Sequence, residues 1–286
     1  MAKKKNGWGK KRRAVVVAGV RTPFVKAFGK FLKLDSIDLG DIAVRKLLEQ
    51  TDVPHQEIDS IVWGGVILPS HAPNIAREIA LDLRLPPSVE GMTCTRACAS
   101  GLQAVTLAAA AIERGEADVV IAGGSDSTSN AALNLPQKAV HALAPLACGK
   151  ASTPADYLGV LSQLMPITEI LPKMPKIAER TTGEVMGESA ESMAKRNEIT
   201  REEQDRFAER SHHRAAEAIA SGRFDHEVTA VEAPDGWVHA DNLVRGDTTF
   251  EKLSKLRPVF SKDGTVTAGN ASPLTDGAAA VLLMSE

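Results

Sequence analysis

Two kinds of apolar run alternate along the first 125 residues of the chain. Short runs rich in valine, isoleucine and alanine predict strands at 14–20, 58–67, 90–96 and 117–124. Longer amphipathic segments predict helices at 39–50, at 74–85 and from near Cys98 onward. Because strands that alternate with helices pair in parallel, the pattern predicts an α/β sheet with helices on both faces. The uninterrupted run at 14–20 further predicts a strand buried on both of its faces.

The third predicted helix carries an apolar stripe formed by Leu102, Val105, Ala109 and Ile112. We expect this stripe to face the core, since side chains three or four positions apart share one side of a helix. Gly101, near the start of the same helix, lets another group approach the backbone closely.

The pattern changes near residue 125. The next hundred residues contain several helical segments and few strand-like runs, which predicts a helical insertion. Within it, a long helix at 200–222 begins with a capping box of Thr200 and Glu203. Strand character returns only at 278–285. We therefore divide the chain into a basic tail (1–13), a first α/β part (14–125), a helical loop domain (126–254) and a return to the α/β part (255–286).

Composition indicates a globular protein. The chain has 286 residues, of which 43% are hydrophobic, enough to bury a large core. No window approaches the ~18 uninterrupted apolar residues of a membrane span. The net charge of -2 gives no bulk attraction to nucleic acid. Three cysteines are too few for a disulfide framework, and the basic start lacks the apolar core of a secretory signal. We therefore expect a cytoplasmic location, or the mitochondrial matrix if the source is eukaryotic.

The first thirteen residues, MAKKKNGWGKKRR, carry seven Lys or Arg and no acidic residue. Such a tail is usually solvated. The alternative is contact with acidic lipid or with the phosphate of a ligand.

Two cysteines four positions apart, Cys94 and Cys98, precede the third helix. A structural zinc needs four ligands, and no further Cys or His lies within twenty residues. A redox pair normally has two intervening residues. A cysteine at a helix N-terminus is better explained as a nucleophile, because the free N–H groups and the helix dipole stabilise its thiolate. We interpret Cys98 as that nucleophile, and Cys94 and Cys148 as small buried residues.

Five segments resemble the thiolases in their order and spacing. They are CTRACASGLQAV (94–105), AGGSDSTSN (122–130), MGESAESMAKRNEITREEQD (186–205), LRPVF (256–260) and TVTAGNASPLTDGAAAVLLMSE (265–286). Within that family the chain is most similar to the thiolase subunit of fatty-acid β-oxidation complexes, including the β subunit of the trifunctional enzyme. The resemblance implies an α/β, thiolase-like layered fold, with a first βαβαβαββ half that carries a helical loop-domain insertion and a second half absent from this chain.

The resemblance also implies an acyltransferase. Cys98 would attack the keto carbon of a 3-ketoacyl-CoA, and its backbone N–H would contribute to an oxyanion hole. CoA would enter as a substrate, with no permanently bound cofactor and no metal. Two alternatives stay open: a biosynthetic acetyl-CoA acetyltransferase that forms acetoacetyl-CoA, and a non-catalytic CoA-binding or assembly subunit.

The family pattern implies six residues that contact CoA. Arg245 would lie against the adenine end and Ser272 against the pantetheine arm, while the pantetheine and acyl channel would be lined by Met186, Phe260, Ala268 and Gly269. The alternative is that Arg245 is a surface cation and Met186 fills the core. The sequence departs from simpler thiolases at Lys252, where they place a CoA-contacting serine, and at Pro273, where they commonly have glycine.

The family's activating histidine and second catalytic cysteine have no counterpart in this chain. We predict that His212 and His213 lie on a solvated helix face and do not replace them. General acid–base help typically supplies ~10²–10⁴ in rate, so the isolated chain is expected to be nearly inactive. In the family fold the helix at Cys98 is sandwiched between two sheets. We therefore expect a second half to be supplied by another chain, or to have been lost by truncation or cleavage.

The resemblance implies a homodimer with the 90–96 strand at the contact. The segment 157–178 is apolar, proline-broken and flanked by lysines. Three roles for it stay open: packing on the core, docking a hydratase/dehydrogenase α subunit, or peripheral contact with a membrane surface.

Overall fold

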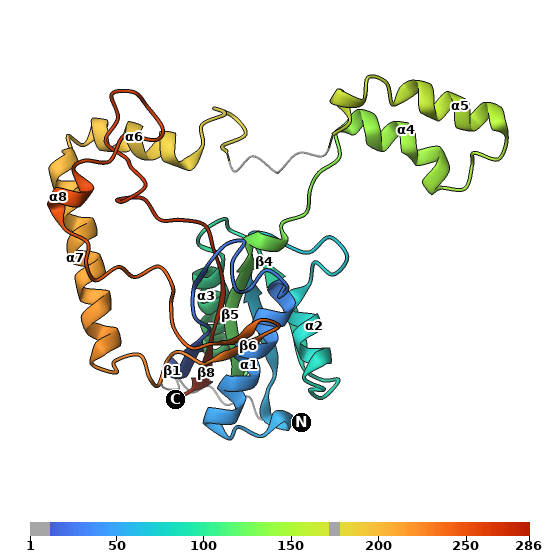
Figure 1. Cartoon of the computed structure of the whole chain (residues 1–286). Helices are drawn as coiled ribbons and strands as arrows, with labels where there is room; N and C mark the ends of the chain where they lie inside the picture. Colours follow the sequence, from blue (N-terminus) through green and yellow to red (C-terminus); the bar gives the residue numbers. More distant parts are fainter. Residues whose placement is uncertain (1–11, 172–177) are drawn as a thin grey trace, which may run out of the picture. The chain divides into compact units, whose positions relative to one another are not determined.

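The computed structural model describes residues 12–171 and 178–286, and its main feature is a 6-stranded mixed sheet (Figure 1). The strands are β1 (Ala14–Arg21), β2 (Val25–Lys26), β3 (Ser60–Gly64), β4 (Glu90–Cys94), β5 (Val119–Ser127) and β8 (Thr275–Ser285). Their order is β1-β8-β5-β3-β4, and β2 also pairs with β8. β3 pairs in parallel with β4 and β5, as predicted.

β8 is antiparallel to β1, β2 and β5, so the prediction of parallel pairing is wrong there. The alternation of strands and helices governs only the early strands. β8 enters the sheet from the far end of the chain, between β1 and β5, and no local pattern fixes its direction.

β1 is an edge strand, and the prediction that it is buried on both faces is wrong. Val16 is 61% exposed and Val17 is 53% exposed. A run of β-branched residues favours extended backbone at any place in a sheet, so it does not distinguish an edge from a centre.

Helices cover both faces of the sheet, which confirms that prediction (Figure 1). α1 (Ser36–Thr51) and α2 (Ile75–Asp82) pack on one face, in a core that includes Trp63. α3 (Ser100–Arg114) packs on the other face, where Ala104, Ala108 and Ile112 are buried against Val62 and Leu283.

The side of α3 that faces the sheet matches the predicted stripe in part: Ile112 is buried, and Val105 and Ala109 pack against the same core. Its buried residues are Ser100, Ala104, Ala108 and Ile112. Leu102 is 69% exposed. Because α3 is apolar on nearly every side, its sequence does not specify which side packs. The structure thus leaves Leu102, near the start of α3, accessible.

The segment after residue 186 contains α6 (Met186–Arg196), α7 (Arg201–Ala220) and α8 (Phe250–Leu253). The capping box of Thr200 and Glu203 is present at the start of α7, as predicted. An unpredicted hairpin joins β6 (Val231–Ala233) to β7 (Gly236–Val238). Its turn signal is Pro-Asp-Gly, with Gly236 at a φ of 111°.

Contacts group residues up to 130 with residues 187–286, and residues 131–186 form a unit of their own. In that second unit α4 (Gln137–Ala147) packs against α5 (Pro154–Gln163) (Figure 1). Short 3-10 helices occur at His55–Glu57, Thr128–Asn130 and Ile167–Glu169. Residues 172–177 of the apolar segment 157–178 lie outside the described residues. Within 12–171 and 178–286, no helix is both long and apolar enough to span a membrane.

Candidate active site

Cys98 lies in the turn between β4 and α3. α3 begins at Ser100 with Ala99 as its N-cap, so Cys98 stands directly before the cap. Ala97 has a φ of 46°, a left-handed conformation that a non-glycine residue seldom adopts. Cys98 is exposed, and the alternative that it is a buried apolar residue is therefore wrong. Strained backbone of this kind clusters at functional sites.

Ser100 holds this turn together. Its Oγ accepts the N–H of Arg96 at 2.8 Å and donates to the carbonyl oxygen of Ala97 at 2.6 Å. The backbone N–H of Ser100 also donates to Ala97, at 3.1 Å. Ser100 itself is buried. The position of the Cys98 thiol is therefore fixed by a hydrogen-bonded backbone, and Ser100 is a functional residue that the sequence analysis missed.

Two glycines let the start of α3 sit directly on the sheet. A Cβ at Gly64 would lie 2.3 Å from the carbonyl carbon of Ser100 and 2.6 Å from the nitrogen of Gly101. A Cβ at Gly124 would lie 2.8 Å from the carbonyl oxygen of Gly64. Around Gly101, by contrast, no described atom beyond its chain neighbours and the backbone of α3 lies within 4 Å of the place a Cβ would take. That space agrees with the expectation that another group approaches Gly101.

Cys98 opens onto a pocket of about 350 Å³. Its walls come from the start of α3, from β5 and β8, and from Phe24 and Val66. Most of the lining is apolar, and Asp126 is a charged residue within it. The Oδ1 of Asp126 accepts the N–H groups of Val66 at 2.8 Å and Ile67 at 2.7 Å. Burial raises the pKa of Asp126, and these two hydrogen bonds oppose the shift. An exposed thiol beside an apolar pocket can carry an acyl group.

The other two cysteines differ from each other. Cys94 is half-buried, and burial raises the pKa of its thiol, which agrees with an unreactive residue packed beside α3. Cys148 is exposed at the C-cap of α4, so its interpretation as a buried residue is wrong. Among the residues that the structure describes, no group of three or more His, Cys, Asp or Glu side chains could hold a metal ion.

Three of the residues implied to contact CoA are brought onto one folded segment. Pro258 pairs with Thr267, and the N–H of Val259 donates to Val266 at 3.0 Å, so Phe260 lies on the same hairpin-like segment as Ala268 and Gly269. Ser272 follows on this segment and is exposed. Met186 is the last residue of the other unit, 131–186. The lining of the Cys98 pocket includes none of the six residues.

Arg245 is exposed and lies in the connection between β7 and α8. Its backbone N–H donates to His212 Nδ1 at 3.2 Å, and His213 Nε2 donates to the carbonyl oxygen of Thr248 at 2.7 Å. His213 is exposed, as predicted, whereas His212 is half-buried, and both histidines bind the 245–248 segment, which the prediction did not include. Lys252 Nζ donates to the Asp247 carboxylate at 2.7 Å, a contact that lowers the pKa of Asp247.

Acidification should loosen the 245–248 segment. Burial lowers the pKa of His212, and the charges of Arg245 and His213 lower it further against the opposing effect of Asp247. The folded-state pKa thus lies below the ordinary value of about 6.5. The stabilisation is present above about pH 6.5 and is lost as the pH falls through the lowered pKa. We expect wild type to lose Tm on acidification more steeply than His212→Gln, whose amide oxygen can still accept the N–H of Arg245. Parallel Tm curves between pH 8 and 5 would contradict this.

Comparison with known proteins gives consistent matches. The family model described as "Thiolase, N-terminal domain" matches residues 14–286. The 3-ketoacyl-CoA thiolases of Pseudoalteromonas translucida and Photobacterium profundum are each 43% identical over 277 residues, which is 96% of this chain and 63% of theirs. The chain therefore spans less than two thirds of the length of these relatives.

Solved structures agree with the sequence matches. Human mitochondrial 3-ketoacyl-CoA thiolase, solved in complex with CoA, superimposes with a TM-score of 0.79 at 31% identity, over 96% of this chain and 65% of that one. The acetyl-CoA acetyltransferase of Bacillus anthracis gives a TM-score of 0.81 at 32% identity, over 96% and 66%. The family model covers nearly all of the described chain, and the same α/β fold recurs in these enzymes, so this chain belongs to the thiolase family.

Proposed function

We propose that this chain is part of an acyltransferase that cleaves 3-ketoacyl-CoA to acetyl-CoA and a shortened acyl-CoA. The observation that carries the proposal is the placement of Cys98: exposed, on a strained turn before α3, and open to a mainly apolar pocket. The curated relatives of similar sequence are named 3-ketoacyl-CoA thiolases, which supports the same substrate class.

In the first step the Cys98 thiolate attacks the keto carbon, C3, of the substrate. The tetrahedral intermediate collapses with breakage of the C2–C3 bond, and the bonding electron pair leaves with the C2 carbanion. Protonation of C2 gives acetyl-CoA, while the rest of the acyl chain remains on Cys98 Sγ as a thioester. The apolar walls of the Cys98 pocket suit that acyl group.

In the second step a CoA thiol loses its proton and attacks the thioester carbonyl. The Cys98 S–C bond breaks, the shortened acyl-CoA departs and the thiolate is restored. Both steps develop negative charge on a carbonyl oxygen, and the backbone N–H of Cys98 contributes to its stabilisation in this proposal. CoA enters as a substrate, and the scheme requires no permanent cofactor.

CoA is bound mainly by the segment after α8. Phe260, Ala268 and Gly269 lie on its hairpin, and Ser272 follows them in an exposed position. Arg245 meets the adenine end in this proposal, and Met186 lines the pantetheine channel. The human structure in complex with CoA supports a CoA site on this fold.

The acid and base for both steps come from a second thiolase half in this proposal. Leu102 on the outer side of α3 and Val16 at the edge of the sheet are 69% and 61% exposed. Apolar patches of more than a few hundred Å² seldom stay exposed in soluble monomers. We therefore expect a second α/β half to cover this face and to complete the site.

The remaining partners belong to the same proposal. β4 is an edge strand with Met92 46% exposed, which supports pairing with a second copy of the chain. Exposed apolar residues around α5, including Leu158 and Leu161, support either a hydratase/dehydrogenase α subunit or a membrane surface as a partner of that unit. A role in fatty-acid β-oxidation and a cytoplasmic or matrix location complete the proposal.

The alternative direction, biosynthesis of acetoacetyl-CoA, uses the same residues in reverse. The superposition on an acetyl-CoA acetyltransferase supports it as the second candidate. A series of 3-ketoacyl-CoA substrates from four to sixteen carbons tests the two with the thiolase assembled from this chain and its second half. We expect kcat/KM to stay high or to rise with chain length. Activity confined to acetoacetyl-CoA would contradict the degradative proposal.

A further inference from the structure

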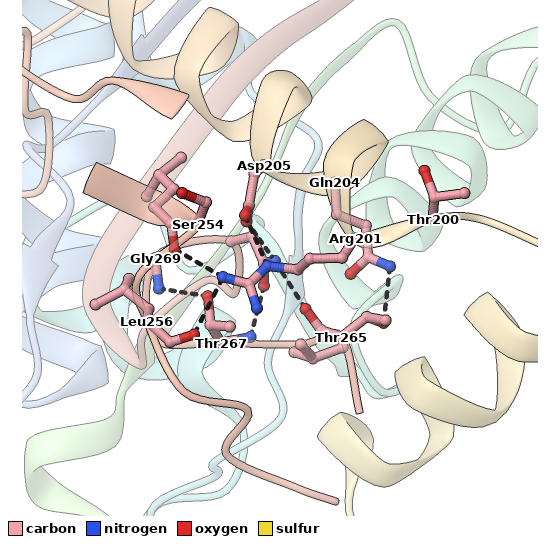
Figure 2. Close-up of polar contacts among 12 residues, drawn as sticks. Thr200, Arg201, Gln204, Asp205, Ser254, Leu256, Thr265, Thr267 and Gly269 are labelled. Carbon is pink, nitrogen blue, oxygen red and sulfur yellow. Dashed lines mark hydrogen bonds and ion pairs between the residues drawn. The ribbon is translucent and has the colours of Figure 1, made fainter. Parts of the chain in front are cut away.

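A buried ion pair lies beneath the segment that carries Ala268 and Gly269 (Figure 2). Arg201 Nε donates to Asp205 Oδ2 at 2.7 Å, one turn apart on α7. Asp205 is fully buried, with 0% of its surface exposed. A carboxylate in that position must have all of its strong contacts supplied by the protein.

Asn270 uses the second oxygen of the buried carboxylate. Its Nδ2 donates to Asp205 Oδ1 at 2.9 Å and to the carbonyl oxygen of Thr265 at 3.0 Å. Its Oδ1 accepts the N–H of Thr267 at 2.7 Å. One amide side chain therefore closes the 265–270 turn and ties it to α7.

Arg201 fixes the other side of the same turn. Its Nη2 donates to the carbonyl oxygens of Leu253 at 2.7 Å and Leu256 at 3.2 Å. Gly269 packs directly against those two residues, because a Cβ added at Gly269 would lie 2.5 Å from a terminal methyl carbon of each. The ion pair thus holds both the turn and the surface on which it rests.

The start of the turn has a separate anchor. Glu191 on α6 accepts the N–H of Thr265 at 2.8 Å and that of Val266 at 2.8 Å. Gln204 Nε2, on α7, donates to Thr265 Oγ1 at 2.9 Å. Loss of the Arg201–Asp205 pair would therefore leave residues 265–267 held, since Thr267 also pairs with Pro258, and release residues 268–271.

We propose that Arg201, Asp205 and Asn270 are positioning residues that hold the 267–272 turn in the shape that accepts the pantetheine arm of CoA. The inference rests on the proposed function, because that function assigns Ala268, Gly269 and Ser272 to CoA. A turn that is already ordered binds a ligand without the cost of ordering it, so the ion pair acts on affinity through these residues.

Binding of CoA to the 286-residue chain, measured by isothermal titration calorimetry, tests the proposal. Asp205→Asn and Asn270→Ala should each raise the Kd for CoA by about tenfold or more, because each frees the turn and leaves a buried polar partner unsatisfied. Glu202→Gln is the matched control. It breaks an ion pair of the same i,i+4 spacing on the same helix, with Arg206, but both side chains there are more than half exposed. Its Kd should match that of wild type.

A second ligand separates positioning from a general loss of structure. Adenosine 3′,5′-bisphosphate lacks the pantetheine arm, so its Kd should be unchanged in each variant that loses affinity for CoA. If Asp205→Asn does not fold, Asn270→Ala carries the test, since it keeps the ion pair. The swap Asp205→Asn with Asn270→Asp, which restores a donor–acceptor contact, should recover part of the CoA affinity.

The outcomes are distinct. If wild type binds CoA and both folded variants bind it equally well, the positioning role is wrong and the proposed function stands. Equal losses for CoA and for the bisphosphate would also overturn it, because the effect would then extend beyond the turn. If wild type shows no affinity for CoA, the proposed CoA site fails, and the positioning role fails with it.

Discussion

Replacing Cys98 with alanine should abolish thiolysis, with kcat lowered by a factor of about 10⁴ or more. The substitution removes the atom that forms the acyl thioester. It leaves the turn intact, since Ser100, and not the thiol, makes the hydrogen bonds that close it. The measurement is the rate of acetyl-CoA release from a 3-ketoacyl-CoA, in the thiolase assembled with its second half.

Cys148→Ala is the control for this experiment. Cys148 is an exposed cysteine in the separate unit 131–186, and we place it in no part of the site. Its loss should leave the rate unchanged. CoA affinity should survive in Cys98→Ala, because the residues proposed to bind CoA are untouched. Retention of more than a few per cent of the wild-type rate in Cys98→Ala would show that another group is the nucleophile.

The second large effect is expected at Gly64. An added methyl group would lie 2.3 Å from the carbonyl carbon of Ser100, and backbone atoms cannot rotate away from it. The start of α3 must shift, and Cys98 must shift with it. A misplacement of about 1 Å costs on the order of 10²-fold in rate. We therefore expect Gly64→Ala to lower kcat by about that factor and to destabilise the fold by about 1–3 kcal/mol.

Gly101→Ala is the matched control for stability. Gly101 lies within α3, and no described atom beyond its chain neighbours and the backbone of α3 comes within 4 Å of the position a Cβ would take. In the isolated chain the substitution should raise the free energy of unfolding by about 0.5–1 kcal/mol, since alanine favours a helix over glycine. Thermal unfolding of both variants gives the comparison. Equal changes in the free energy of unfolding at residues 64 and 101 would contradict the close packing of α3 on β3.

Local elements of this fold were predictable because their patterns are short-range. The strand at β5 and the capping box of Thr200 and Glu203 follow from adjacent residues. The antiparallel insertion of β8 beside β5 does not, because the two strands are separated by about half the chain. On α3 the predicted packing of Ile112 was confirmed, but the exposure of Leu102 was unpredictable, since Leu102 and Ala104 are both apolar and only the tertiary fold selects between them.

In the site, too, some residues could be predicted from their neighbours in the sequence and others could not. Cys98 could be predicted from its place before a helix, and the structure confirms its exposure. Asp126 could not, because it accepts the N–H groups of Val66 and Ile67, which only folding brings close. Ser100 bonds only to Arg96 and Ala97 in its own turn, so a local signal was present but was not used. Asp205 lies on a strongly polar helix that indicates solvent exposure, yet it is fully buried because Arg201 and Asn270 satisfy it.

Peptide mass spectrometry of the assembled thiolase after brief exposure to a 3-ketoacyl-CoA tests the acyl-Cys98 intermediate most directly. We expect one acyl group on the peptide that contains Cys98, shorter than the substrate acyl chain by two carbons, and its release on addition of CoA. An enzyme that cleaves the substrate while Cys98 stays unmodified, or that carries the acyl group on another residue, would contradict it.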